Sequence, residues 1–125
     1  MTMTPTPSPN FSFVTTQVEA CVGWFVEVKV QNSGSITWSA GSVIVKDNVT
    51  STVIPERVSD QFEDWNGCLS ASGMQNDLAP GESGSIHSGD FLYNPAGHEI
   101  LVTVKLCSQN GMSGDCFTKE VTFTP

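Results

Sequence analysis

The sequence is short of charged residues and of strong helix formers. Charged residues make up only 14% of the 125 residues, whereas hydrophobic residues make up 38%. Serine, threonine, asparagine and glycine take the place of charge, and they suit strands and turns better than surface helices. Because alanine, leucine, lysine, arginine and glutamate are scarce, we expect an all-β fold.

Basic residues are the scarcest charged type, and the net charge is −8. They are scattered along the chain: Lys29, Lys46, Arg57, Lys105 and Lys119. A nucleic-acid binder needs a cationic patch that displaces phosphate counterions, and an anionic membrane surface needs one too. No apolar run approaches the roughly 18 residues of a membrane span. We therefore expect no nucleic-acid partner and no membrane insertion.

The sequence also lacks a C-x-x-C pair, so a zinc knuckle or a thioredoxin-type site is not expected. Its cysteines are Cys21, Cys68, Cys107 and Cys116. An even number in an acidic, β-rich domain predicts two disulfides and an extracellular or cell-surface location. Residues 1–10 hold no apolar segment of the signal-peptide kind. We expect a monomeric module of a longer exported protein.

The sequence predicts that the chain consists of a linker and one domain. Proline alternates in the segment TMTPTPSP, where it removes backbone donors and fixes φ, so residues 1–10 are predicted to be an extended linker or stalk. Residues 11–125 are enough for one domain with a real core. Turn residues roughly every 8–12 positions predict an immunoglobulin-like antiparallel β-sandwich of about seven strands.

The clearest strand covers residues 21–31. Its even positions from Val22 to Val30 are all apolar, and its odd positions from Glu27 onward are polar. This period of two predicts one buried face. Further strands are expected at 36–38, 42–46, 50–54 and 83–91. Pro55 is expected to end the strand before it.

The C-terminal hairpin can be paired residue by residue. With Cys107 opposite Cys116, apolar residues meet on one face and polar residues on the other. The predicted pairs are Leu106–Phe117, Val102–Val121, Ile100–Phe123 and Thr103–Glu120. Lys119 is the misfit, because it falls on the inner face opposite Val104. We expect a bulge there or a snorkelling lysine.

This register favours one of the three possible disulfide pairings. It predicts a Cys107–Cys116 bond across the outer face of the hairpin, which leaves Cys21–Cys68 as the second bond. Cys21 lies on the odd, outward face of its strand. The second bond would then tie the irregular 57–76 segment to the outside of the sandwich, unlike the core-crossing bond of antibody domains.

The 57–76 segment is the least regular part of the sequence, with one short helical turn expected at 59–65. It carries an acidic cluster, in which Asp60, Glu63 and Asp64 are candidate calcium ligands, since calcium takes six to eight oxygens from such loops. The spacing matches no EF-hand, and an ordinary solvated acidic loop is the alternative. Calcium is the only cofactor that the sequence suggests.

Two aromatic residues suggest a different ligand. Trp24 and Trp38 are expected to pack in the fold, whereas Trp65, in the acidic segment, is the tryptophan expected to be exposed. Together with Tyr93 it would offer a stacking surface to a sugar ring. The alternative is that Trp65 caps the open end of the sandwich. Phe25, on the otherwise polar face of its strand, hints that the loop covers that end.

Catalysis is not expected. His87 and His98 are the only histidines, and they are predicted to be a surface strand residue and a turn residue. No serine lies in a G-x-S-x-G elbow. Disulfide bonding would also remove the nucleophilicity of the cysteines.

Several turn motifs resemble a family. VKVQNSGSITW (28–38), LAPGES (78–83) and Gly97-His98-Glu99-Ile100 resemble the bacterial cell-adhesion-related (CARDB-type) domains and the Ig-like four-tryptophan domain. Trp38 falls where the four-tryptophan family has a tryptophan, but Val28 replaces another. The resemblance implies a non-catalytic module for adhesion, spacing or display, with an unknown protein or carbohydrate partner. The alternative is a small carbohydrate- or calcium-binding module that uses the 56–77 loop.

Overall fold

The computed structural model describes residues 8–63, 65–66, 69–70 and 74–125, with the backbone alone at 65–66 and 69–70. Over these residues the chain forms strands and no helix, so no helix there is long and apolar enough to cross a membrane. The strands are β1 Ser12–Ala20, β2 Trp24–Gln31, β3 Ala40–Asp47, β4 Val53–Ser59, β5 Trp65–Asn66, β6 Leu69–Ser70, β7 Ser83–His87, β8 Ile100–Gln109 and β9 Ser113–Phe123.

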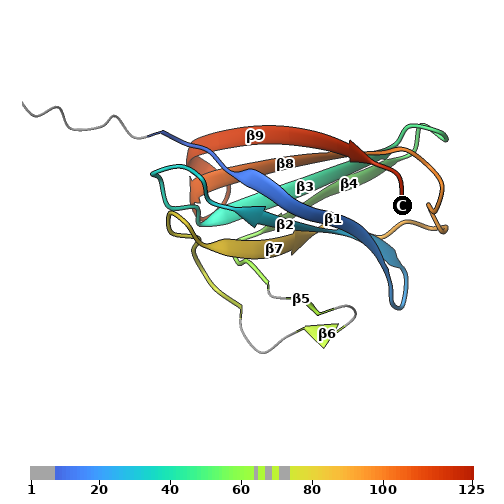
Figure 1. Ribbon diagram of the computed structural model, residues 1–125, viewed down its shortest axis with the longest axis horizontal. Helices are drawn as coiled ribbons and strands as arrows, with labels where there is room; N and C mark the ends of the chain where they lie inside the picture. The colour runs from blue at the N-terminus through green and yellow to red at the C-terminus, as the bar shows by residue number, and fades with distance from the viewer. Residues whose placement is uncertain (1–7, 64, 67–68, 71–73) are drawn as a thin grey trace, which may run out of the picture.

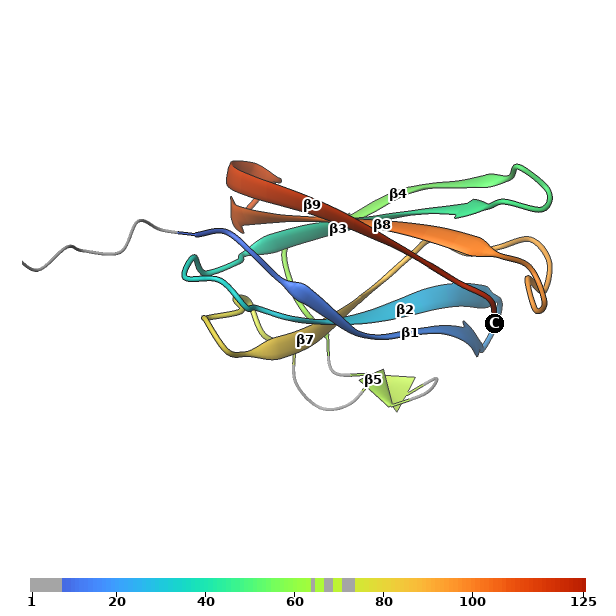
Figure 2. The ribbon, with the colours of Figure 1, turned by 45° about the horizontal axis from the view of Figure 1, so that its top comes forward.

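Two antiparallel sheets face one another, which confirms the predicted all-β sandwich (Figures 1 and 2). One sheet has the order β1-β2-β7, and the other has the order β4-β3-β8-β9. β5 and β6 form a small separate hairpin beside β7. The segment between β4 and β7 passes from one sheet to the other.

The core lies between the sheets and comes from the alternation within the strands. Val26, Val28 and Val30 of β2 are fully buried, as predicted. Val22 is fully exposed, however, and the expectation that it lies in the core is wrong. The strand begins only at Trp24, because the amide of Cys21 bonds to the carbonyl of Gly23 in a tight turn, 2.8 Å apart.

The sides of the sandwich are closed by two phenylalanines. Phe11 is fully buried, and its ring meets the rings of Phe117 and Trp38 edge to face, at 5.9 and 6.5 Å. On the β7 side Phe62 is fully buried as well. A Cβ on Gly84 would lie 2.9 Å from Cβ of Phe62, so a glycine is needed for this close approach.

The expected strands at 36–38 and 50–54 and the expected helical turn at 59–65 are wrong. Trp38 makes only a single bridge, to Leu78. The fourth strand is displaced to Val53–Ser59 and continues through Pro55, because proline sits at a register shift on the edge of the sheet, where no ladder bond is lost. Beyond it, Phe62 and Glu63 form β-bridges rather than a helical turn.

The register of β8 and β9 is the predicted one. All the predicted pairs are present: Ile100–Phe123, Val102–Val121, Thr103–Glu120, Leu106–Phe117 and Cys107–Cys116. Lys119 does pair with Val104, and no register shift occurs there. Its ammonium instead reaches past the core and donates to the carbonyl of Phe11 at 2.9 Å, which is the snorkelling alternative.

The Cys107–Cys116 disulfide is confirmed, with the two Cα atoms 4.1 Å apart. None of the described cysteines, Cys21 included, is a free thiol. Cys68 lies outside the described residues, so the Cys21–Cys68 pairing stays a prediction. A disulfide across a hairpin indicates an oxidising setting.

We expect replacement of both Cys107 and Cys116 by serine to leave the fold intact but to lower the free energy of unfolding by about 2–3 kcal/mol. The bond closes a short loop, with a sequence separation of 9, and a loop of that size restricts the unfolded chain by about this amount. Urea unfolding of both proteins under oxidising conditions measures the difference. Equal midpoints would contradict it.

Candidate functional site

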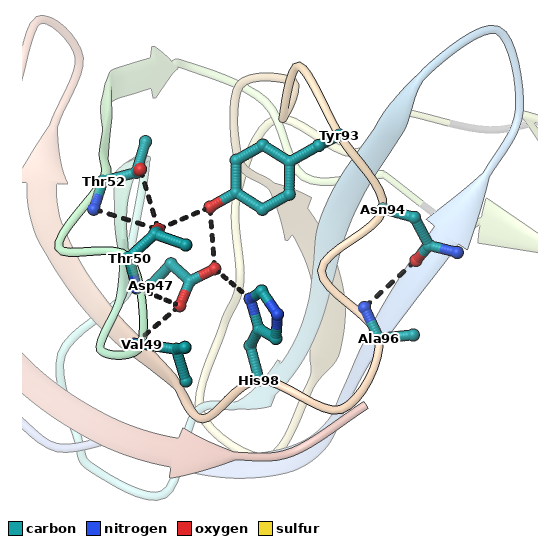
Figure 3. A network of polar contacts seen from close by, with 8 residues as sticks. All are labelled: Asp47, Val49, Thr50, Thr52, Tyr93, Asn94, Ala96 and His98. Carbon is teal, nitrogen blue, oxygen red and sulfur yellow. Dashed lines mark hydrogen bonds and ion pairs between the residues drawn. The ribbon is translucent and has the colours of Figure 1, made fainter.

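The most elaborate polar cluster surrounds the carboxylate of Asp47, the last residue of β3 (Figure 3). Asp47 is fully buried, and its Cα pairs with that of Ile100 at the start of β8. A buried carboxylate is costly unless hydrogen-bond donors surround it. We therefore treat this cluster as the candidate site and ask what its donors are.

The first pair of donors comes from the turn between β3 and β4. The amides of Val49 and Thr50 donate to Oδ1 of Asp47 at 2.8 and 3.2 Å, which is the local geometry that aspartate favours in turns. The amide of Asp47 donates to the carbonyl of Thr52 at 2.8 Å. Ser51 completes the turn with a positive φ of 61°. The carboxylate thus fixes the turn that follows it.

The second pair of donors comes from the long connection between β7 and β8. The hydroxyl of Tyr93 donates to Oδ2 of Asp47 at 2.7 Å, and Nδ1 of His98 lies 2.6 Å from the same oxygen. Figure 3 shows both rings directed at the one carboxylate. The ring of Tyr93 also packs edge to face on that of Phe91, at 5.8 Å. One side chain of β3 therefore holds two separate loops.

The four hydrogen bonds determine the charge state of the carboxyl group. Burial by itself raises the pKa of Asp47, because it disfavours the charged form. The bonds from His98, Tyr93, Val49 and Thr50 together outweigh burial and bring the pKa well below its usual range. The group is therefore an ionised acceptor at neutral pH, with the protons of its neighbours directed toward it.

A histidine on a buried aspartate resembles two members of a hydrolytic triad, so the third member has to be examined. The aliphatic hydroxyl group that meets this cluster is that of Thr50. It lies 2.9 Å from the hydroxyl of Tyr93 and donates to Thr52 at 2.8 Å, so its hydrogen bonds do not go to His98. A nucleophile needs a base within hydrogen-bond reach. What the described contacts do is join the β3–β4 turn to the β7–β8 connection through Asp47.

The candidate calcium ligands have other partners. Asp60 accepts a hydrogen bond from the amide of Gly111 in the β8–β9 turn, at 2.9 Å. Glu63 lies 3.7 Å from the guanidinium of Arg57 and 3.5 Å from the ring of His87. Asp64 lies outside the described residues. The part of the chain that the structure describes contains no group of three metal-ligating side chains, and the calcium site stays a prediction.

Of the two aromatic residues predicted to stack on a sugar, only Tyr93 has a side chain among the described residues. Tyr93 is a member of the Asp47 cluster, with its hydroxyl donating to Asp47 and lying 2.9 Å from the hydroxyl of Thr50. The backbone of Trp65 lies in β5, but its side chain is outside the described residues. Phe25 is buried and contacts the ring of His87 at 5.1 Å. The predicted surface strand residue His87 is therefore half-buried, in contact with a phenylalanine and a glutamate.

Asp47 is not among the site residues that the sequence predicted, although one signal in the sequence could have identified it. Val43 and Val45 occupy the inner face of β3, and extending their alternation by one step brings Asp47 onto the same face. An aspartate at the next inward position of a strand needs buried donors. The identity of those donors, Tyr93 and His98, is not encoded in the spacing.

We expect Asp47→Asn to lower the free energy of unfolding by about 3 kcal/mol, because the amide group would turn a donor toward Tyr93 and His98 and leave buried groups unpaired. The exposed Asp90 provides the control variant, Asp90→Asn. Chemical unfolding at neutral pH measures both. Equal losses for the two variants would contradict a special role for Asp47.

The same carboxylate predicts a pH dependence. Its pKa is lower in the folded protein than in the unfolded chain, so its stabilisation is complete above about pH 4 and is lost as the pH falls toward the folded value. We expect the melting temperature of the native protein to fall more steeply below pH 4 than that of Asp47→Asn. If the melting temperatures of both proteins fell equally steeply below pH 4, this expectation would be contradicted.

Comparison with known proteins supplies no relative from which a role could be transferred to the Asp47 cluster. No protein-family model matches the chain, and no curated protein matches it. The function therefore has to be argued from the geometry of the sandwich and its polar clusters.

Proposed function

We propose that this protein is a non-catalytic, extracellular immunoglobulin-like module that serves adhesion, spacing or display within a larger secreted or surface protein. The observation that carries the proposal is the Asp47 cluster. Its aspartate, histidine and tyrosine are residue types that often act in acid–base catalysis. In this cluster their polar groups bond to one another and to a turn. Groups used in this way stabilise loops.

The strand order supports the immunoglobulin-like part of the proposal. Read in chain order and without the small β5–β6 hairpin, the first, second and fifth strands form one sheet, and the third, fourth, sixth and seventh form the other. Immunoglobulin-type sandwiches likewise separate their second strand from their third and sixth strands. The Cys107–Cys116 disulfide supports the extracellular setting.

The path of the chain supports a spacing role. The first described residues lie at one end of the long axis, and Pro125 lies at the other (Figure 1). The carbonyl of Pro125 accepts a hydrogen bond from the amide of Gly97 at 2.8 Å, which fixes the position of Pro125. Within a longer chain, a module with its ends so placed would extend that chain by its own length.

Titration separates this proposal from the alternative of a carbohydrate- or calcium-binding module. We expect the tryptophan fluorescence of the oxidised protein to stay flat when calcium, and then a panel of soluble polysaccharides, is added. The fluorescence would report a ligand in the 56–77 loop because Trp65 is part of this loop and directly follows the candidate calcium ligand Asp64. A saturable change that disappears in Trp65→Ala would overturn the proposal in favour of a binding site in that loop.

Force spectroscopy tests the spacing role directly. Strands β1 and β9 bear the two ends of the chain, and pulling through these ends loads their hydrogen bonds along the strand direction (Figure 2). We expect a higher unfolding force in this geometry than when the handles are attached at residue 49, through Val49→Cys, and at the C-terminus. The β3–β4 turn that holds residue 49 and the C-terminus both bond to the connection before β8, through Asn48 to Glu99 and through Pro125 to Gly97, so these two points lie at the same end of the sandwich. Equal forces would count against a spacer.

A further inference from the structure

The two sheets have four edge strands, and three of them carry protection against pairing with another chain. The edge strand β4 contains Pro55 and a register shift. The edge of β7 is bridged by Glu63, whose backbone exchanges hydrogen bonds of 2.7 and 2.8 Å with Ser85. The strand β1 is interrupted by a register shift at Val14. Natural sheets use such devices to block their edges.

The edge strand β9 differs from the other three. From Cys116 to Phe123 it pairs with β8 without a register shift and without proline. Its single lysine, Lys119, points to the carbonyl of Phe11 on the inner side and so does not guard the edge. β9 thus presents the longest uninterrupted run of strand edge among the described residues.

The disulfide shows which backbone groups of β9 face outward from the sheet. Its two Cα atoms are 4.1 Å apart, which is the close spacing of an antiparallel pair that exchanges no hydrogen bonds. The N–H and C=O groups of Cys116 therefore point away from β8. Because the pattern alternates along an unbroken register, those of Thr118, Glu120 and Thr122 point the same way.

We propose that β9 pairs antiparallel with β9 of a second copy of this chain, about a two-fold axis at Thr118. The strand is its own complement in only some registers. An axis at Lys119 or at Glu120 would place a like charge directly opposite itself, which is destabilising. With the axis at Thr118, threonine faces threonine, Glu120 faces Cys116, and the outward groups of all three residues are paired.

This pairing would join two four-stranded sheets into one continuous sheet and satisfy edge groups that are otherwise left to water. It rests on the geometry of the sandwich and not on the proposed function. It also departs from the monomer expected from the sequence. The axis makes Thr118 its own neighbour, and a symmetric interface of this kind can be tested at a single residue.

Light scattering and sedimentation of the oxidised, full-length protein over a range of concentrations test the proposal. We expect the mass to rise from that of one chain, 13.4 kDa, to twice that value at millimolar concentration. Thr118 is exposed, so Thr118→Lys and Thr118→Glu fit the fold. Each variant alone is expected to remain a single chain, because like charges then face across the axis, and an equimolar mixture is expected to recover the doubled mass.

The control is Thr15→Lys, the same change at an exposed position of the edge strand β1, which should leave the dimer intact. A wild-type mass of one chain at every concentration would overturn the proposal. Loss of the dimer in Thr15→Lys as well, or failure of the Thr118→Lys and Thr118→Glu mixture to recover it, would also overturn it.

Discussion

The apolar layer between the two sheets has to be shielded from water on all four sides. Buried aromatic and polar side chains at the sides and ends of the sandwich do this. Phe11 and Phe62 seal the two long sides. At one end the buried amide group of Asn32 donates to the carbonyls of Ile36 and Leu78 at 2.7 and 2.9 Å. At the other end the carboxylate of Asp47 gathers two loops. Within the described residues no buried side-chain polar atom lacks a partner, which is what a water-free interior requires.

This closure links the fold to the proposed function. A histidine bonded to a buried aspartate is a catalytic arrangement only when a nucleophile or a substrate meets the free side of the ring. In this protein the hydroxyl of Tyr93 donates to Asp47 and that of Thr50 donates to Thr52, and the cluster fastens the turn after β3 to the connection before β8. The contacts of the cluster hold two loops together at one end of the sandwich, and the proposed spacing or display role rests on this feature.

The edges of the sheets are another place where a sandwich can contact a second chain. Each edge of a sheet exposes backbone donors and acceptors, and a protein either blocks them or uses them. In this chain Pro55 and the bridge from Glu63 block two edges, whereas β9 is left regular. The Cys107–Cys116 bond links β9 to β8, so the disulfide stabilises the hairpin to which this edge belongs.

The sequence by itself determined the sandwich, the alternation of β2 and the register of the C-terminal hairpin, because each depends on neighbours in the chain or on strict period-two patterning. It also placed Lys119 opposite Val104. Tertiary structure alone decided how Pro55 is tolerated, since that depends on β4 being an edge strand. It also decided that Tyr93 and His98 bond to Asp47. Loops at the end of a sandwich meet through residues that are far apart in the sequence, and the spacing of residues along the chain does not predict such contacts.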